Sequence, residues 1–309
     1  MTDIPDRDAP HPRNRLNELS GREWLYATRS IALSGTPPIP LNDLSPDEWA
    51  AWSAPLLTAA YPTRGADSAA HHIRRAHPSP KPPALMAEIL RFFTRSGDNV
   101  LDPFAGVGGT LLACAQTGRV GTGIELSADY IALYQQAAAA LELPTLPILH
   151  GDAREWLGQP PISEQSFDLV LTDPPYSSML SRARTGQRRK QGRGEATPFT
   201  ADPADLGNLD YGAFLDALRE IVAATVQPLR VGGHLVLFVK DLQPTTDHHN
   251  MLHADVVTAL YQLPSLRYRG YRIWYDQSAA LYPFGYPYSF VANQVHQFML
   301  IFQKQEERE

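Results

Sequence analysis

The stretch NVLDPFAGVGGTLLACA, residues 99–115, decides the fold of this chain. It reads as a short apolar strand, then a glycine-rich turn, then an apolar pattern of helical spacing. Glycines in such a turn let a ligand approach the backbone closely, and the N–H groups at the start of the next helix point at that ligand. The pattern predicts a strand-turn-helix unit of an open α/β sheet, with a ligand site at the turn.

Two further strands follow, and each ends at an acidic residue. Residues 120–124, VGTGI, lead to Glu125, at roughly the twenty-residue offset where an acidic side chain meets ribose hydroxyls in nucleoside-binding folds. Residues 147–150, PILH, lead to Asp152, whose carboxylate can accept from an adenine amino group. The turn itself carries Asp102 and has no lysine at the helix start. An amine-bearing ligand is therefore favoured over a pyrophosphate.

A fourth apolar strand, FDLVL at residues 167–171, runs into the turn TDPPY at residues 172–176. Asp173 offers a carboxylate, the two prolines stiffen the turn and remove backbone donors, and Tyr176 offers a flat ring. This set suits a planar aromatic amine, because Asp173 and the carbonyl of Pro174 can accept its N–H bonds while Tyr176 stacks on its face. The same residues are also typical of a plain proline-containing turn.

In this order, the motifs resemble those of the S-adenosylmethionine-dependent amino-methyltransferases of DNA. In that family a D-P-F-x-G-x-G-type loop holds the methionine part of the cofactor, and a D/N/S-P-P-Y/F/W turn holds the nitrogen that is methylated. The resemblance runs from about Asn17 to Lys304. It implies S-adenosyl-L-methionine as the cofactor and a Rossmann-like methyltransferase fold, an α/β fold with a mostly parallel seven-stranded sheet and a reversed edge strand.

Other segments add to the resemblance. HPSPKP at residues 77–82 resembles the family's motif just before the cofactor loop, which closes over the methionyl end. DLGN at 205–208, HAD at 253–255 and FGYPY at 284–288, with Asn293 and His296, are similar to a subgroup of prokaryotic site-specific DNA methyltransferases. Serine at the position of Asp173 is the commoner choice among cytosine-N4 enzymes, so cytosine N4 and adenine N6 both stay open as targets.

The patterns and the resemblance together give the expected site. The expected catalytic residues are Asp173, Pro174, Pro175 and Tyr176. The expected cofactor-binding residues are Lys81, Asp102, Pro103, Phe104, Ala105, Gly106, Gly108, Thr110, Glu125, Leu126, Asp152, Ala153 and Asp173.

The net charge of -6 argues mildly against DNA, which is a polyanion. The distribution of charge favours DNA, because a basic segment without an acidic residue directly follows the catalytic turn. A basic loop in that position can clamp phosphates or enter a groove beside a flipped base, although an isolated charge run is more often a solvated loop. The expected DNA-binding residues are Arg182, Arg184, Arg188, Arg189, Lys190 and Arg193.

Composition excludes several other chemistries. The single cysteine, Cys114, excludes an internal disulfide and a multi-cysteine zinc site. It lies in the helix after the glycine-rich turn and not after the fourth strand, so the thiolate attack that methylates cytosine carbon-5 has no candidate nucleophile. The adjacent histidine pairs at 71–72 and 248–249 lack ligand spacing, so no metal site is expected. No apolar run of membrane length and no signal peptide stand out, which predicts a cytoplasmic enzyme.

The chain divides into three predicted parts. Residues 1–15 are rich in Pro, Asp and Arg and predict a disordered tail. Residues 16–75 carry helical signals and predict an N-terminal extension, and residues 76–305 form the methyltransferase domain, with the basic loop within 180–210. Within that domain, helices are expected at 85–93, 211–226 and 255–261, and strands at 234–239, 271–275 and 297–302.

The sequence thus predicts a site-specific DNA methyltransferase that moves a methyl group from S-adenosylmethionine to the exocyclic amino group of a flipped base. An RNA guanine-N2 methyltransferase is the alternative within enzymes, since those enzymes share a D-P-P-Y turn and motif order. A catalytically silent DNA-binding regulator is the alternative of another class. The expected partner is double-stranded DNA, with no membrane. A cognate restriction endonuclease, as in restriction-modification, and a homodimer are left open.

Overall fold

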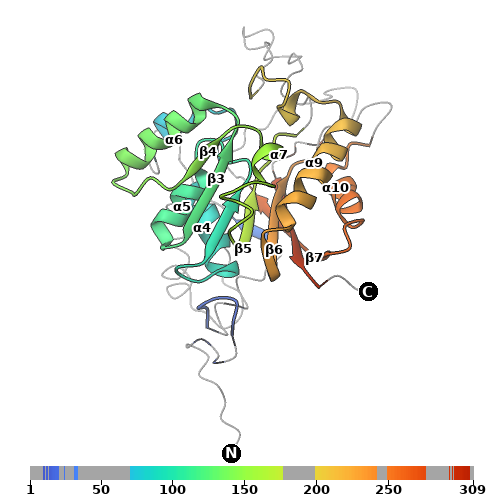
Figure 1. The fold of residues 1–309 in the computed structure, drawn as a ribbon, viewed down its shortest axis with the longest axis horizontal. Coiled ribbons are helices and arrows are strands. Elements are labelled where there is room, and N and C mark those ends of the chain that lie inside the picture. The colour runs from blue at the N-terminus through green and yellow to red at the C-terminus, as the bar shows by residue number, and fades with distance from the viewer. Residues whose placement is uncertain are drawn as a thin grey trace, which may run out of the picture.

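The computed structural model describes residues 70–176, 199–241, 249–275 and 296–306, together with residues 10, 12, 14–20, 24, 31–33, 292 and 294. At its centre lies an eight-stranded sheet with the strand order β1-β7-β8-β6-β5-β2-β3-β4. Helices pack on both faces of this sheet, which gives three layers (Figure 1). The strands are β1 (Ile31–Leu33), β2 (Asn99–Asp102), β3 (Val120–Glu125), β4 (Ile148–His150), β5 (Phe167–Thr172), β6 (Leu229–Val239), β7 (Leu266–Tyr275) and β8 (His296–Lys304).

All neighbouring strands run parallel except at β8, which is antiparallel to both β6 and β7. The expected α/β fold, with a mostly parallel sheet and one reversed strand, is therefore confirmed. One detail differs from the expectation. The reversed strand lies between β6 and β7 and not at the edge, because β7 takes the outer position and β1 adds an eighth strand beyond it.

The described helices are α3 (His71–Arg74), α4 (Pro83–Phe93), α5 (Gly109–Thr117), α6 (Ala128–Ala140), α7 (Ala153–Trp156), the 3-10 turn η3 (Leu206–Asn208), α9 (Tyr211–Val226) and α10 (Leu252–Leu260). The predicted helix at 211–226 has the observed bounds of α9. It begins there because the Asp210 carboxylate accepts the N–H of Ala213 at 2.9 Å, which caps the first turn. Likewise, α4 begins at a proline, whose missing N–H costs nothing at a helix start.

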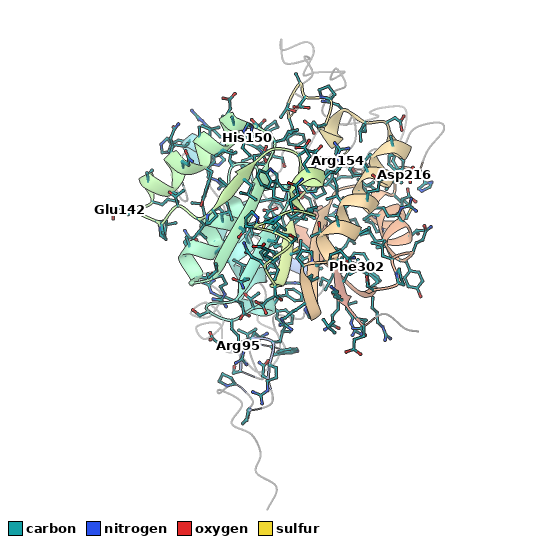
Figure 2. All side chains as sticks on the ribbon, in the orientation of Figure 1. Arg95, Glu142, His150, Arg154, Asp216 and Phe302 are labelled. Carbon is teal, nitrogen blue, oxygen red and sulfur yellow. The ribbon has the colours of Figure 1, made fainter. Side chains whose placement is uncertain are left out.

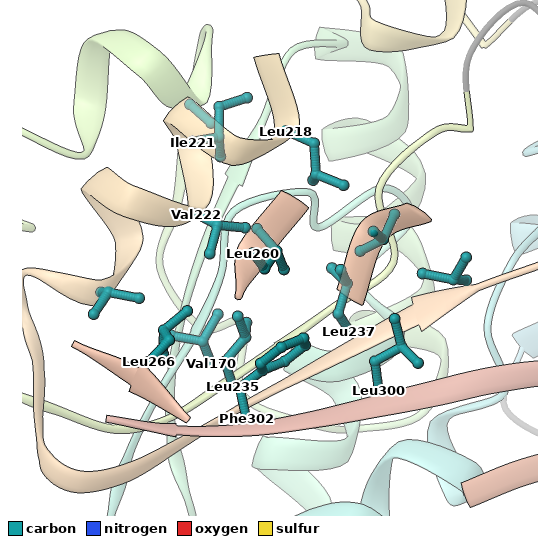
Figure 3. Packing of buried hydrophobic residues seen from close by; sticks show 14 of the residues in the cluster. Val170, Leu218, Ile221, Val222, Leu235, Leu237, Leu260, Leu266, Leu300 and Phe302 are labelled. Carbon is teal, nitrogen blue, oxygen red and sulfur yellow. The ribbon is translucent and has the colours of Figure 1, made fainter. Parts of the chain in front are cut away.

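One face of the sheet is covered by α7, α9 and α10. Apolar side chains at helical spacing on α9, among them Leu218, Ile221 and Val222, pack on Val170 of β5 and Leu235 of β6 in one buried cluster (Figure 3). On the other face, α4 and α5 bury Leu90, Phe93 and Cys114 against the strands, and α6 packs beside α5. Burial on both faces explains why the central strands read as continuous apolar runs.

Strand β6 is longer than the predicted 234–239. It runs through Gly232 and Gly233, and its register with β5 shifts between Phe167 and Leu169. Gly232 has a φ of 81°, which favours glycine. The two glycines, which precede the predicted strand, thus lie at an irregularity within the observed one.

The N-terminal part is only sparsely described. β1 lies within the stretch for which helices were expected, and it joins the edge of the sheet beside β7. Most of residues 1–69 and all of residues 177–198, which include the basic residues of the predicted loop, lie outside the described residues. The predicted domain boundaries therefore stay predictions.

Candidate active site

A pocket lies at the carboxyl end of the sheet, where β2, β3, β4 and β5 deliver the acidic residues that follow or end them. Figure 2 shows His150 and Arg154 at this end of the molecule and Arg95 at the opposite end. The pocket brings together residues from distant parts of the sequence. Of the expected site residues, it is lined by Lys81, Asp102, Pro103, Phe104, Ala105, Gly106, Thr110, Glu125, Leu126, Asp152, Ala153, Asp173 and Pro175.

The glycine-rich loop is shaped by two left-handed residues. Gly106 has a φ of 52° and Gly108 a φ of 74°, and both values favour glycine. A Cβ at Gly108 would lie 2.0 Å from the ring of Tyr134, so this glycine serves the packing of α6 and does not line the pocket. A Cβ at Gly106 would lie 3.3 Å from Nε2 of His77, which lines the pocket opposite it.

Glu125 anchors this loop. Its two carboxylate oxygens accept the N–H of Gly106 at 2.7 Å and the N–H of Ser127 at 2.8 Å. Burial raises the pKa of Glu125 to about 7, although these two N–H groups oppose the shift. Each oxygen keeps acceptor capacity for a further hydrogen bond, and Glu125 lines the pocket.

Asp102 joins the loop to the neighbouring strand. Its Oδ1 accepts the N–H of Phe104 at 3.1 Å and the hydroxyl of Thr172, the last residue of β5, at 2.7 Å. Burial raises the pKa of Asp102 to about 6, and the nearby Asp173 carboxylate adds to this shift. The glycine-rich loop and the TDPPY turn are thus held together by one carboxylate.

Asp152 already forms an ion pair with Arg154. It caps α7 by accepting the N–H of Arg154 at 2.9 Å, and the guanidinium Nε of Arg154 lies 3.0 and 2.9 Å from its two oxygens. Arg154 also donates to the carbonyl of Ala204 at 3.0 Å. A bond from Asp152 to an adenine amino group stays a prediction, and it would share the carboxylate with Arg154.

The catalytic turn has a tight internal arrangement. One oxygen of Asp173 accepts the hydroxyl hydrogen of Tyr176, and the other is paired with the ammonium of Lys81. Tyr176 is 6% exposed, and neither it nor Pro174 lines the pocket. The expected stacking of Tyr176 on a base therefore stays a prediction, since in this structure the ring belongs to the core.

Sequence reasoning missed one wall of the pocket, formed by residues 199–206. Asp205 shapes this segment by accepting the N–H and the hydroxyl of Thr200, both at 2.9 Å. The hydroxyl of Tyr130 on α6 donates to the carbonyl of Phe199 at 2.7 Å and ties the segment to the opposite side. The DLGN motif was a visible signal for this wall.

Arg74 was also missed. It is 2% exposed, it lines the pocket, and its guanidinium donates to the carbonyl of Val107 at 3.2 Å and to that of Lys81. Burial lowers the pKa of Arg74 to about 10. Among the described residues it forms no ion pair with a carboxylate, and an uncompensated buried cation is costly. No local motif around residue 74 signals this role.

His77 is near the cations Lys81 and Arg74 and also contacts two aromatic rings. Its ring centroid lies 4.6 Å from that of Tyr130 and 5.2 Å from that of Phe199, and its Nδ1 accepts the N–H of Ser79 at 3.1 Å. Burial, followed by the charges of Lys81 and Arg74, lowers the pKa of His77 to about 3. The ring is therefore neutral at physiological pH and serves as a polar aromatic wall.

Other expectations fall outside the pocket or the described residues. Arg182, Arg184, Arg188, Arg189, Lys190 and Arg193 lie outside the described residues, as do the FGYPY motif and Asn293. In the HAD motif, His253 stacks on Phe298 with ring centroids 4.0 Å apart, and its Nδ1 contacts Asp241 at 2.8 Å. Cys114 is buried, which raises the pKa of its thiol and fits a packing role.

Two further features are absent from the described part of the chain. No group of three or more His, Cys, Asp or Glu side chains there is placed to hold a metal ion. None of the described helices combines the length and the apolar character that crossing a membrane requires.

Comparison with known proteins finds that parts of this chain are similar to methylases. The family described as DNA methylase matches residues 43–136. The putative methylase YubD of Escherichia coli (strain K12) is 43% identical over 68 residues, which cover 22% of this chain and 30% of that protein. The type II methyltransferase M.HpaI of Haemophilus parainfluenzae is 36% identical over 63 residues, which cover 20% of each chain.

A second kind of relative also matches. The tRNA (guanine(10)-N(2))-methyltransferase TRMT11 of Homo sapiens is 28% identical over 177 residues, which cover 48% of this chain and 36% of that protein. The chain thus matches between 20% and 36% of the length of these three curated relatives. The family model and these relatives match only parts of this chain, and all of them are described as methylases or methyltransferases. A methyltransferase family implies S-adenosylmethionine as the cofactor.

The residues of the pocket fit that cofactor. Glu125 and Asp102 supply acceptors for hydroxyl and amino groups, and Arg74 supplies a buried cation for a carboxylate. Ile124, Leu126 and Ala153 supply apolar surface for a purine ring. The donor and acceptor types in the pocket therefore match the ribose, amino-acid and adenine parts of S-adenosylmethionine.

Proposed function

We propose that this protein transfers a methyl group from S-adenosylmethionine to the exocyclic amino group of a base in double-stranded DNA. One observation carries the proposal. The acceptor Asp173 lies in the same pocket as the cofactor loop, and the hydroxyl of Thr172, its neighbour, is bonded to Asp102 of that loop. An amine acceptor and a cofactor site that share one wall suit direct transfer between the two ligands.

Each residue would have a defined task. Glu125, Asp102 and Arg74 would hold the cofactor, which supplies a methyl group that its sulfonium sulfur has already activated. Asp173 would accept an N–H of the target amine and favour a pyramidal nitrogen whose lone pair faces the methyl carbon. The nitrogen forms its bond to that carbon as the carbon–sulfur bond breaks, and one N–H proton leaves to Asp173 or to water.

The family match and the two methylase relatives support DNA as the substrate, and so does the basic segment 182–193, which follows the catalytic turn in sequence. We also propose a cytoplasmic location and leave the target base open between adenine and cytosine. Methylation of guanine N2 in RNA is the second candidate, because the TRMT11 match covers 48% of this chain.

A tritium-transfer assay separates the candidates. Purified protein is given S-adenosylmethionine labelled in the methyl group, with unmethylated duplex DNA or with unmodified transfer RNA transcripts. We expect label in the DNA, and label only in the RNA would replace the first proposal by the second. Retention of DNA on a filter without any transfer would instead indicate a silent DNA-binding protein. The Asp173→Ala variant serves as the background control.

A further inference from the structure

The side chain of Lys81 contacts the catalytic turn, whereas its main chain lies near the cofactor loop. The sequence places it in the HPSPKP motif, for which a cofactor-binding role was expected. In the structure its ammonium pairs with Oδ2 of Asp173, 92 residues away along the chain. The side chains of the two residues are 4% and 15% exposed, so the pair is largely shielded from water. Removing one partner of an ion pair that is shielded in this way leaves an uncompensated charge, which costs far more than breaking an exposed pair.

The rest of the Lys81 environment also positions the ammonium. Its Nζ lies 5.4 Å from the ring centroid of Phe238 on β6 and 5.9 Å from that of Trp274 on β7. These two rings are nearly perpendicular, at 88°. Aromatic faces attract a cation without accepting its protons. The ammonium is therefore held against the sheet, with Asp173 as its carboxylate partner.

The Lys81 backbone is fixed as well. Its carbonyl accepts from the buried Arg74 guanidinium. A Cβ on Gly109, the first residue of α5, would lie 2.8 Å from the same carbonyl oxygen, so only glycine allows this close approach. Lys81 thus has its main chain against the cofactor loop and its side chain on the catalytic turn.

Asp173 needs such a partner. It follows β5, next to β2 and its Asp102, and two nearby carboxylates repel each other in a poorly solvated pocket. Lys81 compensates one of the two charges. Tyr176 donates to the other oxygen, so each oxygen of Asp173 carries one donor. A carboxylate has about four acceptor sites, so acceptor capacity remains for the two hydrogens of an amino group.

We propose that Lys81 is a positioning residue for methyl transfer: it holds the Asp173 carboxylate in the orientation that accepts the target amine, and it does not bind the cofactor. The role in transfer rests on the proposed function. The ion pair itself does not, so the two can be tested separately.

The test compares Lys81→Met, Asp173→Asn and the double variant with wild type. Methionine keeps the length of the side chain and suits the contacts with Phe238 and Trp274, and Lys81→Gln is the second variant if Lys81→Met does not fold. Lys304→Met is the matched control, because Lys304 donates to carbonyls at the end of α9, away from the pocket. Calorimetry measures S-adenosylmethionine affinity, tritium transfer to duplex DNA gives kcat, and urea denaturation gives stability.

We expect Lys81→Met to lower kcat roughly 10- to 100-fold, the scale of one charge-assisted hydrogen bond, with cofactor affinity within about threefold of wild type. In the double variant, kcat should fall no further than in Asp173→Asn. An equal loss of cofactor affinity and kcat would overturn the proposal by making Lys81 a cofactor ligand, and so would an unchanged kcat.

Urea denaturation distinguishes a failure of the proposed function from a failure of the proposed Lys81–Asp173 pairing. If wild type methylates neither DNA nor RNA, the proposed function is wrong. Non-additive stability of Lys81→Met and Asp173→Asn would then still support the ion pair. Additive stability changes would overturn the pairing, whatever the activity shows.

Discussion

The hydroxyl of Thr172 donates to the carboxylate of Asp102 across β5 and β2, with 2.7 Å between the oxygen atoms. Thr172 is the last residue of the strand that delivers the catalytic turn, and Asp102 is the last residue of the strand that delivers the cofactor loop. Both side chains are buried. The relative position of the two motifs therefore depends on a side-chain bond as well as on the strand pairing.

Replacing Thr172 by Val should weaken this connection. Valine keeps the shape of threonine but leaves Asp102 without one of its donors, so the free energy of unfolding should fall by about 1–3 kcal/mol. Urea denaturation measures the loss. The matched control is Thr172→Ser, which keeps the hydroxyl and should retain the bond. Equal losses in both variants would show that packing of the methyl group, and not the hydrogen bond, matters at this position.

Asp173→Ala should abolish methyl transfer and leave cofactor binding intact. The change removes the acceptor for the target amine, while the bonds of Glu125 to the cofactor loop remain. Tritium transfer and calorimetry on the same preparation check the two halves of the expectation. Turnover near the wild-type rate would remove Asp173 from the mechanism.

Cofactor affinity should rise with pH between about 5.5 and about 8. Burial raises the pKa of Asp102 to about 6 and that of Glu125 to about 7, so both carboxyls lose their protons in this window. The ionised forms are the better acceptors for the hydroxyl and amino groups of the cofactor. Calorimetry at several pH values measures the trend.

Glu125→Gln is the control for this trend, because it cannot ionise. It should bind the cofactor more weakly at high pH, by about 1.5–3 kcal/mol for the lost charge-assisted bond, and its affinity should vary less with pH. A wild-type affinity that stays flat across the window would contradict the assigned roles of both carboxyls.

Arg74 should recognise the carboxylate of the cofactor's amino-acid part. Arg74→Met should weaken binding of S-adenosylmethionine roughly 10- to 100-fold, because a buried charge-assisted bond is lost. Binding of methylthioadenosine should hardly change, since that compound lacks the amino-acid part. Calorimetry measures the affinity for both compounds. If Arg74→Met instead disrupts the whole pocket, the affinities for S-adenosylmethionine and for methylthioadenosine should fall together.

The basic segment should control the salt dependence of DNA binding. If its cations contact phosphates, each neutralised contact should flatten the slope of log affinity against log salt by about 0.9. The triple variant of Arg188, Arg189 and Lys190 to Ala should therefore bind DNA more weakly and with a smaller slope, at unchanged cofactor affinity. An unchanged slope and unchanged sequence preference would make the segment a solvated linker.

Local signals in the sequence predicted most of the sheet and the acidic residues at its carboxyl end. The apolar runs before Asp102, Glu125 and Asp173 are strands because buried parallel strands need apolar residues on both faces. The bounds of α9 followed from helical spacing, and the structure adds the cap by Asp210. In each of these cases the information lies within a few neighbouring residues.

Pairings between distant residues could not be predicted in this way. Arg74 and the wall at 199–206 reach the pocket only through the packing of the whole domain. The pairing of Lys81 with Asp173 depends on where α4 meets the sheet, which no spacing in the motif reveals. The position of β8 between β6 and β7 could not be predicted either. Both β7 and β8 read as apolar strands, and their sequences do not show which of the two pairs with β6.

The pairing of β1 with β7 also bears on the order in which the protein folds. Ile31 lies opposite Ile273, so the first and one of the last described strands are neighbours although nearly the whole chain separates them. Closing so long a loop has a high entropic cost, and contacts of this kind form late. During synthesis, residues 31–33 leave the ribosome long before their partner strand exists. The edge of the sheet is therefore completed only after β7 has been made, and residues 31–33 must wait for this partner until then.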